Sequence, residues 1–149
     1  AFLGDLPLTV TEDEVQYVHA SADAPGEWNY VRSDTRAVPS FRASAARIIL
    51  CGHVHVPLLV SCERSGQVRA QSFRSGLPVP LIRSRRWLAV IGAVGLARDG
   101  HAQAGYAILD RDRDELTFRR VAYDVARTAE KIRAAGLPEA LAQRLMAGE

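Results

Sequence analysis

Two histidines separated by one residue follow an apolar stretch in the middle of the chain. The run Ile48–Cys51 is short, apolar and partly β-branched, which is typical of a strand buried on both faces, and Gly52 ends it. In extended backbone, residues i and i+2 point the same way, so we expect His53 and His55 to aim at one small volume. Neutral imidazole is the commonest metal ligand in proteins. The pair therefore indicates metal binding at the end of a strand; a plain loop that carries two histidines is the alternative.

A third histidine ends another stretch with the pattern of a strand. Residues 14–20 alternate in polarity, and His19 falls on the same face as Val15. A hydrogen-bonded structural histidine is the alternative to a ligand here. His101 lies in a polar turn with no strand to aim it, so we expect it to stay outside any site. Cys51, beside the histidine pair, is expected to be a small buried hydrophobe rather than a soft ligand.

The composition is that of one globular domain spanning residues 1–149, with 48% apolar and 24% charged residues. The net charge of +2 is small, and no broad basic face is evident, so nucleic-acid binding is not expected. No apolar run is long enough to span a bilayer, and no signal peptide is recognised at the start. The two cysteines form no disulfide framework, which favours a reduced, cytoplasmic protein.

The remaining pattern predicts further strands and a helical end. A helix is expected over 38–46, beginning after Pro39, and the first eight residues are expected to be a loop. Two more helices should follow Asp124, a good N-cap, and Pro138. The other expected strands are 58–62, 67–73, 86–91, 105–109 and 116–123, with a small-residue turn over 92–95.

Three short motifs occur in a characteristic order: Val-His-Ala-Ser at 18–21, Cys-Gly-His-Val-His-Val-Pro at 51–57 and Gly-Leu-Ala-Arg-Asp-Gly at 95–100. In this order they resemble the C-terminal half of a calcineurin-like metallophosphoesterase, of the small bacterial phosphoesterase type. The resemblance runs from Leu6 to Met146. It implies an α/β (α+β) fold, part of a four-layer αββα sandwich with mixed sheets and C-terminal packing helices. Residues 1–149 would be the C-terminal half of a single such domain.

The resemblance also implies an activity and its cofactors. Such proteins hydrolyse phosphate esters with two divalent metal ions, here Mn²⁺, Fe or Zn²⁺, that clamp the phosphoryl oxygens and lower the pKa of the attacking water. Carried over by motif, His19 and His53 would bind one ion and His55 the other. Arg98 and Asp99 would lie on a loop beside the substrate pocket. A phosphomonoesterase, a phosphodiesterase and a protein phosphatase all fit this description.

The motifs of the family's first half are missing. They are an Asp-x-His motif, a Gly-Asp motif whose Asp bridges the ions, and a Gly-Asn-His motif; Gly4-Asp5 stands in the wrong context. The family's catalytic histidine is therefore absent from this chain, which alone is expected to be inactive. We predict that another chain, or residues outside this sequence, supply the N-terminal half. Without that half, the strand at Ile48–Cys51 would be expected to lie unpaired at a sheet edge.

Two alternatives remain open at this point. The first is a non-catalytic interaction or scaffold protein that kept the fold and lost the metal site. It is favoured by Ala93, where relatives commonly have Ser, and by Leu96-Ala97, where they have Gln-Pro. The second is a mononuclear zinc site made by His19, His53 and His55 with an open fourth position.

Overall fold

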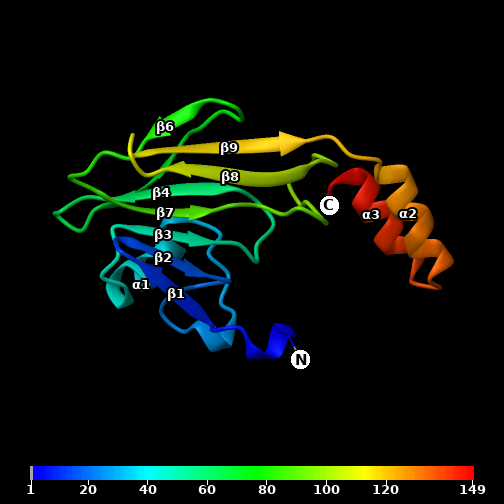
Figure 1. Ribbon diagram of the computed structural model, residues 1–149, viewed down its shortest axis with the longest axis horizontal. Coiled ribbons are helices and arrows are strands. Elements are labelled where there is room, and N and C mark those ends of the chain that lie inside the picture. Colours follow the sequence, from blue (N-terminus) through cyan, green and yellow to red (C-terminus); the bar gives the residue numbers. More distant parts are fainter. Residues whose placement is uncertain (1) are drawn as a thin grey trace.

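The computed structural model describes residues 2–149, which form two sheets and three α-helices (Figure 1). The larger sheet has the spatial order β1-β2-β3-β7-β4-β5, and the smaller has the order β6-β9-β8. The strands of the larger sheet are β1 (Thr9–Glu12), β2 (Val15–Val18), β3 (Ile48–Cys51), β4 (Leu58–Cys62), β5 (Val68–Gln71) and β7 (Arg86–Val90). Those of the smaller sheet are β6 (Pro78–Pro80), β8 (Ala104–Asp110) and β9 (Glu115–Val121). The helices are α1 (Asp34–Ala43), α2 (Val125–Ala134) and α3 (Glu139–Ala147), with short 3₁₀ turns at Phe2–Asp5 and Pro25–Glu27.

Three parallel strands, β2, β3 and β7, form the centre of the larger sheet, and antiparallel strands flank them. Their carboxyl ends therefore meet at one edge of the sheet. Beyond the strands, Gly52 N donates to His19 O at 2.9 Å, which holds the first two ends together. The expectation that β3 lies at an edge is wrong: it pairs with β2 on one side and β7 on the other. The edge strands are β1 and β5, and β1 was not expected from the sequence.

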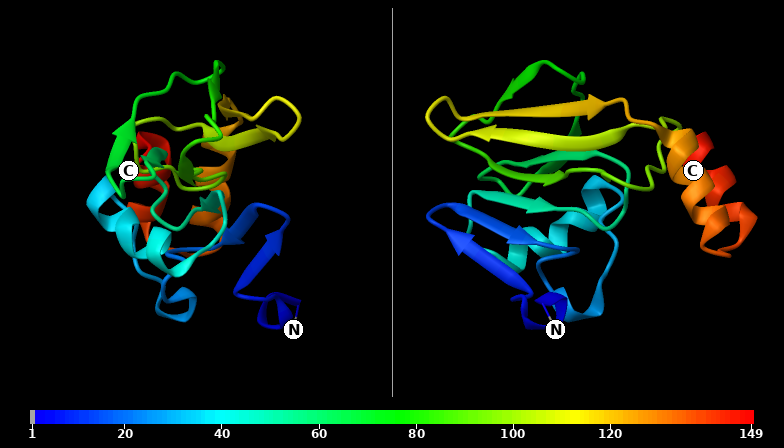
Figure 2. Two further views of the ribbon diagram at one scale, coloured as in Figure 1. Left: turned by 90° about the vertical axis from the view of Figure 1, so that its left-hand side faces the viewer. Right: turned by 45° about the vertical axis from the view of Figure 1, so that its right-hand side comes forward.

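Apolar residues alternate along the central strands, so the larger sheet buries both of its faces. Ile49 and Leu88 point into a cluster with Phe41 of α1. Their neighbours Ile48 and Trp87 point into a second cluster, with side chains of β9. The chain thus forms three layers, α1, the larger sheet and the smaller sheet, and the α2–α3 pair lies beyond the end of the sheets (Figures 1 and 2). The expected α/β (α+β) sandwich is confirmed; the larger sheet is mixed, and the smaller sheet is antiparallel.

The expected helix after Pro39 begins earlier than the sequence suggested. Its N-cap is Ser33, whose hydroxyl accepts a hydrogen bond from Arg36 N at 3.2 Å, and Pro39 lies inside the helix. The expected cap at Asp124 is present and accepts from Arg127 N at 2.8 Å. Within residues 2–149, no helix has the length and apolar character needed to cross a membrane.

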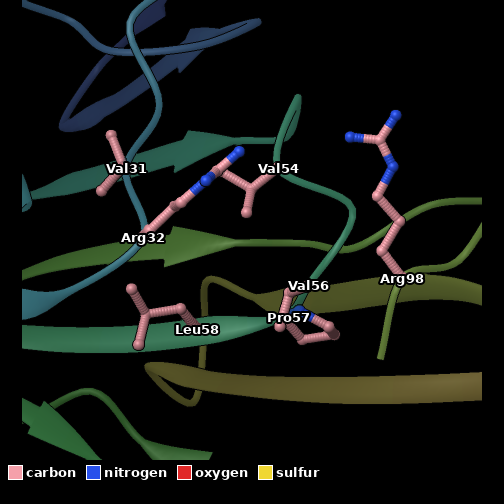
Figure 3. Close-up of a pocket in the computed structure, with 7 residues that line it drawn as sticks. All are labelled: Val31, Arg32, Val54, Val56, Pro57, Leu58 and Arg98. Carbon is pink, nitrogen blue, oxygen red and sulfur yellow. The ribbon is translucent and has the colours of Figure 1, made fainter. Parts of the chain in front are cut away.

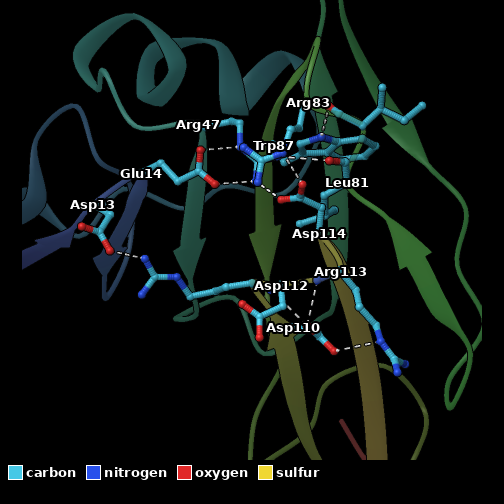
Figure 4. A network of polar contacts seen from close by, with 12 residues as sticks. Asp13, Glu14, Arg47, Leu81, Arg83, Trp87, Asp110, Asp112, Arg113 and Asp114 are labelled. Atoms are coloured by element: carbon cyan, nitrogen blue, oxygen red, sulfur yellow. Dashed lines mark hydrogen bonds and ion pairs between the residues drawn. The ribbon is translucent and has the colours of Figure 1, made fainter.

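An arginine at the amino end of β3 joins the two sheets, at the opposite end of the strand from the histidines (Figure 4). Arg47 donates to both carboxylate oxygens of Glu14, at 2.8 and 2.6 Å, and to Leu81 O at 3.1 Å. It also pairs with Asp114, which pairs in turn with Arg83. The Arg47 hydrogen bonds are the main reason that the pKa of Glu14 lies below its ordinary value of 4.5.

We expect Arg47→Gln to lower the free energy of unfolding by about 2 kcal/mol at neutral pH, the scale of charged hydrogen bonds in a partly buried setting. Because the folded-state pKa of Glu14 is lowered, the Glu14 contribution is complete above pH 4.5 and is lost as pH falls through the lowered value. The difference between wild type and variant should therefore shrink in acid. Denaturant titrations at several pH values measure it. Arg113→Gln, at a side chain 77% exposed, is the control, and an equal loss there would contradict the prediction.

Candidate metal site

His19 and His53 lie together at the carboxyl edge of the parallel strands. His19 Nε2 and His53 Nδ1 are 3.1 Å apart. Two nitrogens bound to one ion at about 2.0–2.1 Å, with bond angles between octahedral and tetrahedral, are about 2.9–3.4 Å apart. The observed spacing fits a proton shared by two imidazoles and equally fits a single ion held by both. The pairing of β2 with β3 creates this arrangement. His19 directly follows β2, and His53 follows Gly52, the residue after β3.

The segment that carries the histidine pair is a tight turn rather than extended backbone. His53 and His55 have left-handed φ angles of 64° and 67°, and Val54 N donates to Gly52 O at 2.7 Å. The extended backbone expected here is therefore wrong, and the i, i+2 argument that depended on it does not apply to this turn. Left-handed backbone costs free energy at residues other than glycine and clusters at functional sites. Two such residues in one four-residue turn mark this segment as specialised.

His55 is oriented by a carbonyl group. His55 Nδ1 lies 2.6 Å from Leu96 O, and a carbonyl oxygen only accepts, so Nδ1 carries the proton. The Nε2 lone pair is then free to bind a metal ion. This is how proteins usually fix the tautomer of a ligating histidine. The backbone continues the contact, since Arg98 N donates to His55 O at 3.2 Å.

Two aromatic residues of the 25–31 loop contact the paired histidines. Tyr30 stacks on His53 with ring centroids 4.4 Å apart and an interplanar angle of 20°, and Trp28 lies 4.6 Å from His19. Burial is the main cause that lowers the pKa of His53, followed by the charges of His19, His55 and Arg98. His53 therefore stays neutral to lower pH than an ordinary histidine, with a lone pair available. The sequence analysis did not assign the two aromatic residues to the site; their closeness in an otherwise polar loop was the available signal.

The described residues do not by themselves form a complete metal site. Within residues 2–149, no three His, Cys, Asp or Glu side chains are grouped closely enough to hold an ion. The donors are the His19–His53 pair and, separately, Nε2 of His55. Cys51 adds nothing, because burial raises the pKa of its thiol to about 12 and keeps it protonated. Imidazoles alone provide no negative charge to offset the charges of two adjacent cations.

The loop after β7 holds the other residues singled out from the sequence. Arg98 lines a pocket beside the histidine turn. Asp99 is 10% exposed and pairs with Arg120, so its carboxylate anchors the loop to β9. His101 is 59% exposed, and its Nδ1 lies 2.9 Å from Asp99 O. None of the described hydrogen bonds or ring contacts of His101 involves the other three histidines.

Two solved structures are similar to this chain over nearly its whole length. A metallophosphoesterase from Sphaerobacter thermophilus superposes on the chain with a TM-score of 0.88 and 34% identity, over 99% of this chain. The chain has a calcineurin-like metallophosphoesterase fold. A hypothetical protein from Pyrococcus horikoshii shares the fold, with a TM-score of 0.67 and 17% identity over 99% of this chain. No protein-family model matches the sequence.

The proteins that this chain matches are longer than the chain itself. An uncharacterized protein of Methanocaldococcus jannaschii is 31% identical over 99% of this chain, which spans 58% of that protein. This chain covers 62% of the Sphaerobacter structure and 53% of the Pyrococcus structure. The chain thus spans little more than half the length of the proteins it matches.

Proposed function

We propose that this chain is part of a metal-dependent phosphoesterase with a dinuclear metal centre. The observation that carries the proposal is the 3.1 Å contact between His19 and His53, in a metallophosphoesterase fold, beside a His55 whose Nε2 is free. His19 and His53 would hold one ion and His55 the other. When bound, Mn²⁺, Fe or Zn²⁺ would stabilise charge on the phosphoryl oxygens and lower the pKa of the attacking water.

The residues of this chain have distinct tasks in that scheme. Leu96 O holds the His55 ring in one tautomer, and Tyr30 holds the plane of His53. Trp28 and Tyr30 shield the paired imidazoles from bulk water on one side, which strengthens electrostatic interactions there. His19 and His53 form a pair, and His55 stands apart from them. This arrangement supports the dinuclear centre over the mononuclear zinc alternative, in which all three histidines would bind one ion.

The rest of the ligand set, including a bridging carboxylate and the catalytic histidine, is proposed to come from an N-terminal half of the domain. An apolar groove of about 730 Å³ lies beside His19. The groove is on the side of the larger sheet that the smaller sheet covers at other positions. Contiguous apolar surface of this kind marks an interface. We propose that the N-terminal half covers this groove. Its exposed apolar residues, between 37% and 58% exposed, are Leu6, Leu8, Val10, Tyr17 and Trp28.

Assay of the native protein with para-nitrophenyl phosphate and its bis-ester tests the proposal. After removal of metal with a chelator, we expect no turnover, and activity should return with Mn²⁺, Fe²⁺ or Zn²⁺ but not with Ca²⁺. Imidazole ligands favour the former ions, whereas Ca²⁺ prefers oxygen. Absence of turnover of either ester with every metal would contradict the proposal. That outcome would favour the non-catalytic relative, which the apolar side chains of Ala93 and Leu96 also favour.

A further inference from the structure

A pocket of about 370 Å³ adjoins the histidine turn, and two arginines stand at it. Its apolar wall includes Val54, which lies between the two histidines of the turn, together with Val56 and Leu58. Figure 3 shows Arg32 and Arg98 on opposite sides of the segment that carries Val54 and Val56. The pocket therefore combines an apolar body with two positive charges, directly beside the residues proposed to hold the metal ions.

Arg98 is positively charged and has no carboxylate partner among the described residues. Its Nε atom is buried without a hydrogen-bond partner, and its guanidinium forms no ion pair with any carboxylate in the described part of the chain. The neighbouring Asp99 is already occupied by Arg120. Arg98 N donates a hydrogen bond to His55 O, so the Arg98 side chain starts beside the histidine turn. A buried donor without a partner costs free energy unless a ligand satisfies it.

Arg32 reaches the pocket from the opposite loop and is also without an ion-pair partner among the described residues. Its guanidinium lies 4.3 Å from the ring centroid of Tyr30, and Tyr30 stacks in turn on His53. Asp23 lines a neighbouring pocket that shares Arg32, but no ion pair joins them. The stack Arg32–Tyr30–His53 sets the position of the guanidinium relative to the paired histidines.

We infer that this pocket binds the alcohol portion of the phosphate ester and selects an apolar body that carries a second anionic group. The inference rests on the proposed function for the position of the scissile phosphate. Hydrolysis would then release inorganic phosphate and an anionic alcohol. A guanidinium recognises a carboxylate or phosphate by charge-assisted hydrogen bonds, and the valine and leucine side chains favour a ring or a short chain.

Two aryl phosphates test this inference on the native protein: para-carboxyphenyl phosphate and phenyl phosphate. Binding to the metal-free protein is measured by calorimetry, and kcat/KM is measured with metal. We expect the carboxylated ester to be preferred by at least about tenfold in both measurements, the scale of one charge-assisted hydrogen bond. Arg32→Gln and Arg98→Gln should each remove most of that preference. Arg74→Gln, which removes the same charge from an exposed loop, should leave it unchanged.

The outcomes separate the pocket from the proposed function. Arginine-dependent binding of the carboxylated ester without turnover would support the pocket while the proposed hydrolysis fails. Turnover of both esters with equal kcat/KM and equal binding would support the hydrolysis and overturn the pocket. Equal losses in Arg74→Gln and Arg98→Gln would also overturn it, because a general charge effect would then explain the preference. Thermal melting of each variant confirms that the comparison is made on folded protein.

Discussion

Replacing His53 with Ala is expected to lower the metal affinity of the native protein by more than about 100-fold and to abolish the proposed turnover. Loss of an outer partner of a metal ligand already costs about 10- to 100-fold in affinity, and a direct ligand should cost more. His53 also contacts His19 at 3.1 Å and stacks on Tyr30, so its removal leaves the remaining imidazole without a second nitrogen. Competition with a chromophoric chelator measures the dissociation constant for Mn²⁺ and Zn²⁺.

Matched histidine variants make this result specific. His55→Ala should produce a similar loss at the second ion, because Nε2 of His55 is the proposed donor there. His101→Ala should stay near wild type, since the His101 side chain is 59% exposed and its described polar contacts are with Asp99 of the same loop. If His101→Ala lost as much affinity as His53→Ala, the assignment of ligands would be wrong. Unchanged metal affinity in His53→Ala would contradict it equally.

Replacing Leu88 with Ala destabilises the protein by about 3 kcal/mol, within the range of about 2–5 kcal/mol for buried leucines. Leu88 lies on β7 in the centre of the larger sheet and is fully buried, at 0% exposure. Its side chain belongs to the cluster that joins the sheet to α1, and the cavity left by truncation cannot be filled by rigid strands on both sides. Denaturant unfolding followed by circular dichroism measures the change.

The matched control is Leu77→Ala, the same chemical change in a loop at a side chain 56% exposed. We expect this variant to stay within about 0.5 kcal/mol of wild type. A loss below about 1 kcal/mol for Leu88→Ala would show that the interface between α1 and the larger sheet contributes less than its burial indicates. The folded Leu88→Ala protein should keep its metal affinity, because the site is built by other residues.

Most of the fold could be predicted from the sequence because its apolar pattern is strong. The strands β3, β4 and β7 are short apolar runs, and the β8–β9 hairpin alternates around a charged turn. Strand β1 was missed because Thr9–Glu12 is mostly exposed and lacks an apolar face. The start of α1 was missed because Pro39 resembles a helix start, whereas the capping hydroxyl belongs to Ser33.

The candidate site could be predicted only in part. That His19 and His53 come together follows from parallel pairing of their strands, which the buried pattern of Ile48–Cys51 indicates. The left-handed turn at His53 and His55 could not be predicted, since this backbone is uncommon at any residue other than glycine. The stack of Tyr30 on His53 depends on how a loop folds over the sheet edge. The nearness of Trp28 and Tyr30 in the sequence does not indicate which ring they contact.

Elemental analysis of the native protein tests the central claim most directly, by counting metal ions per domain. The claim is that His19 and His53 hold one ion and His55 a second, with ligands from the N-terminal half that complete the site. The predicted result is two ions of Mn, Fe or Zn per domain, falling in His53→Ala and unchanged in His101→Ala. One ion per domain would indicate a mononuclear zinc site, and none would indicate a protein that kept the fold without the metal. Either result would contradict the dinuclear centre.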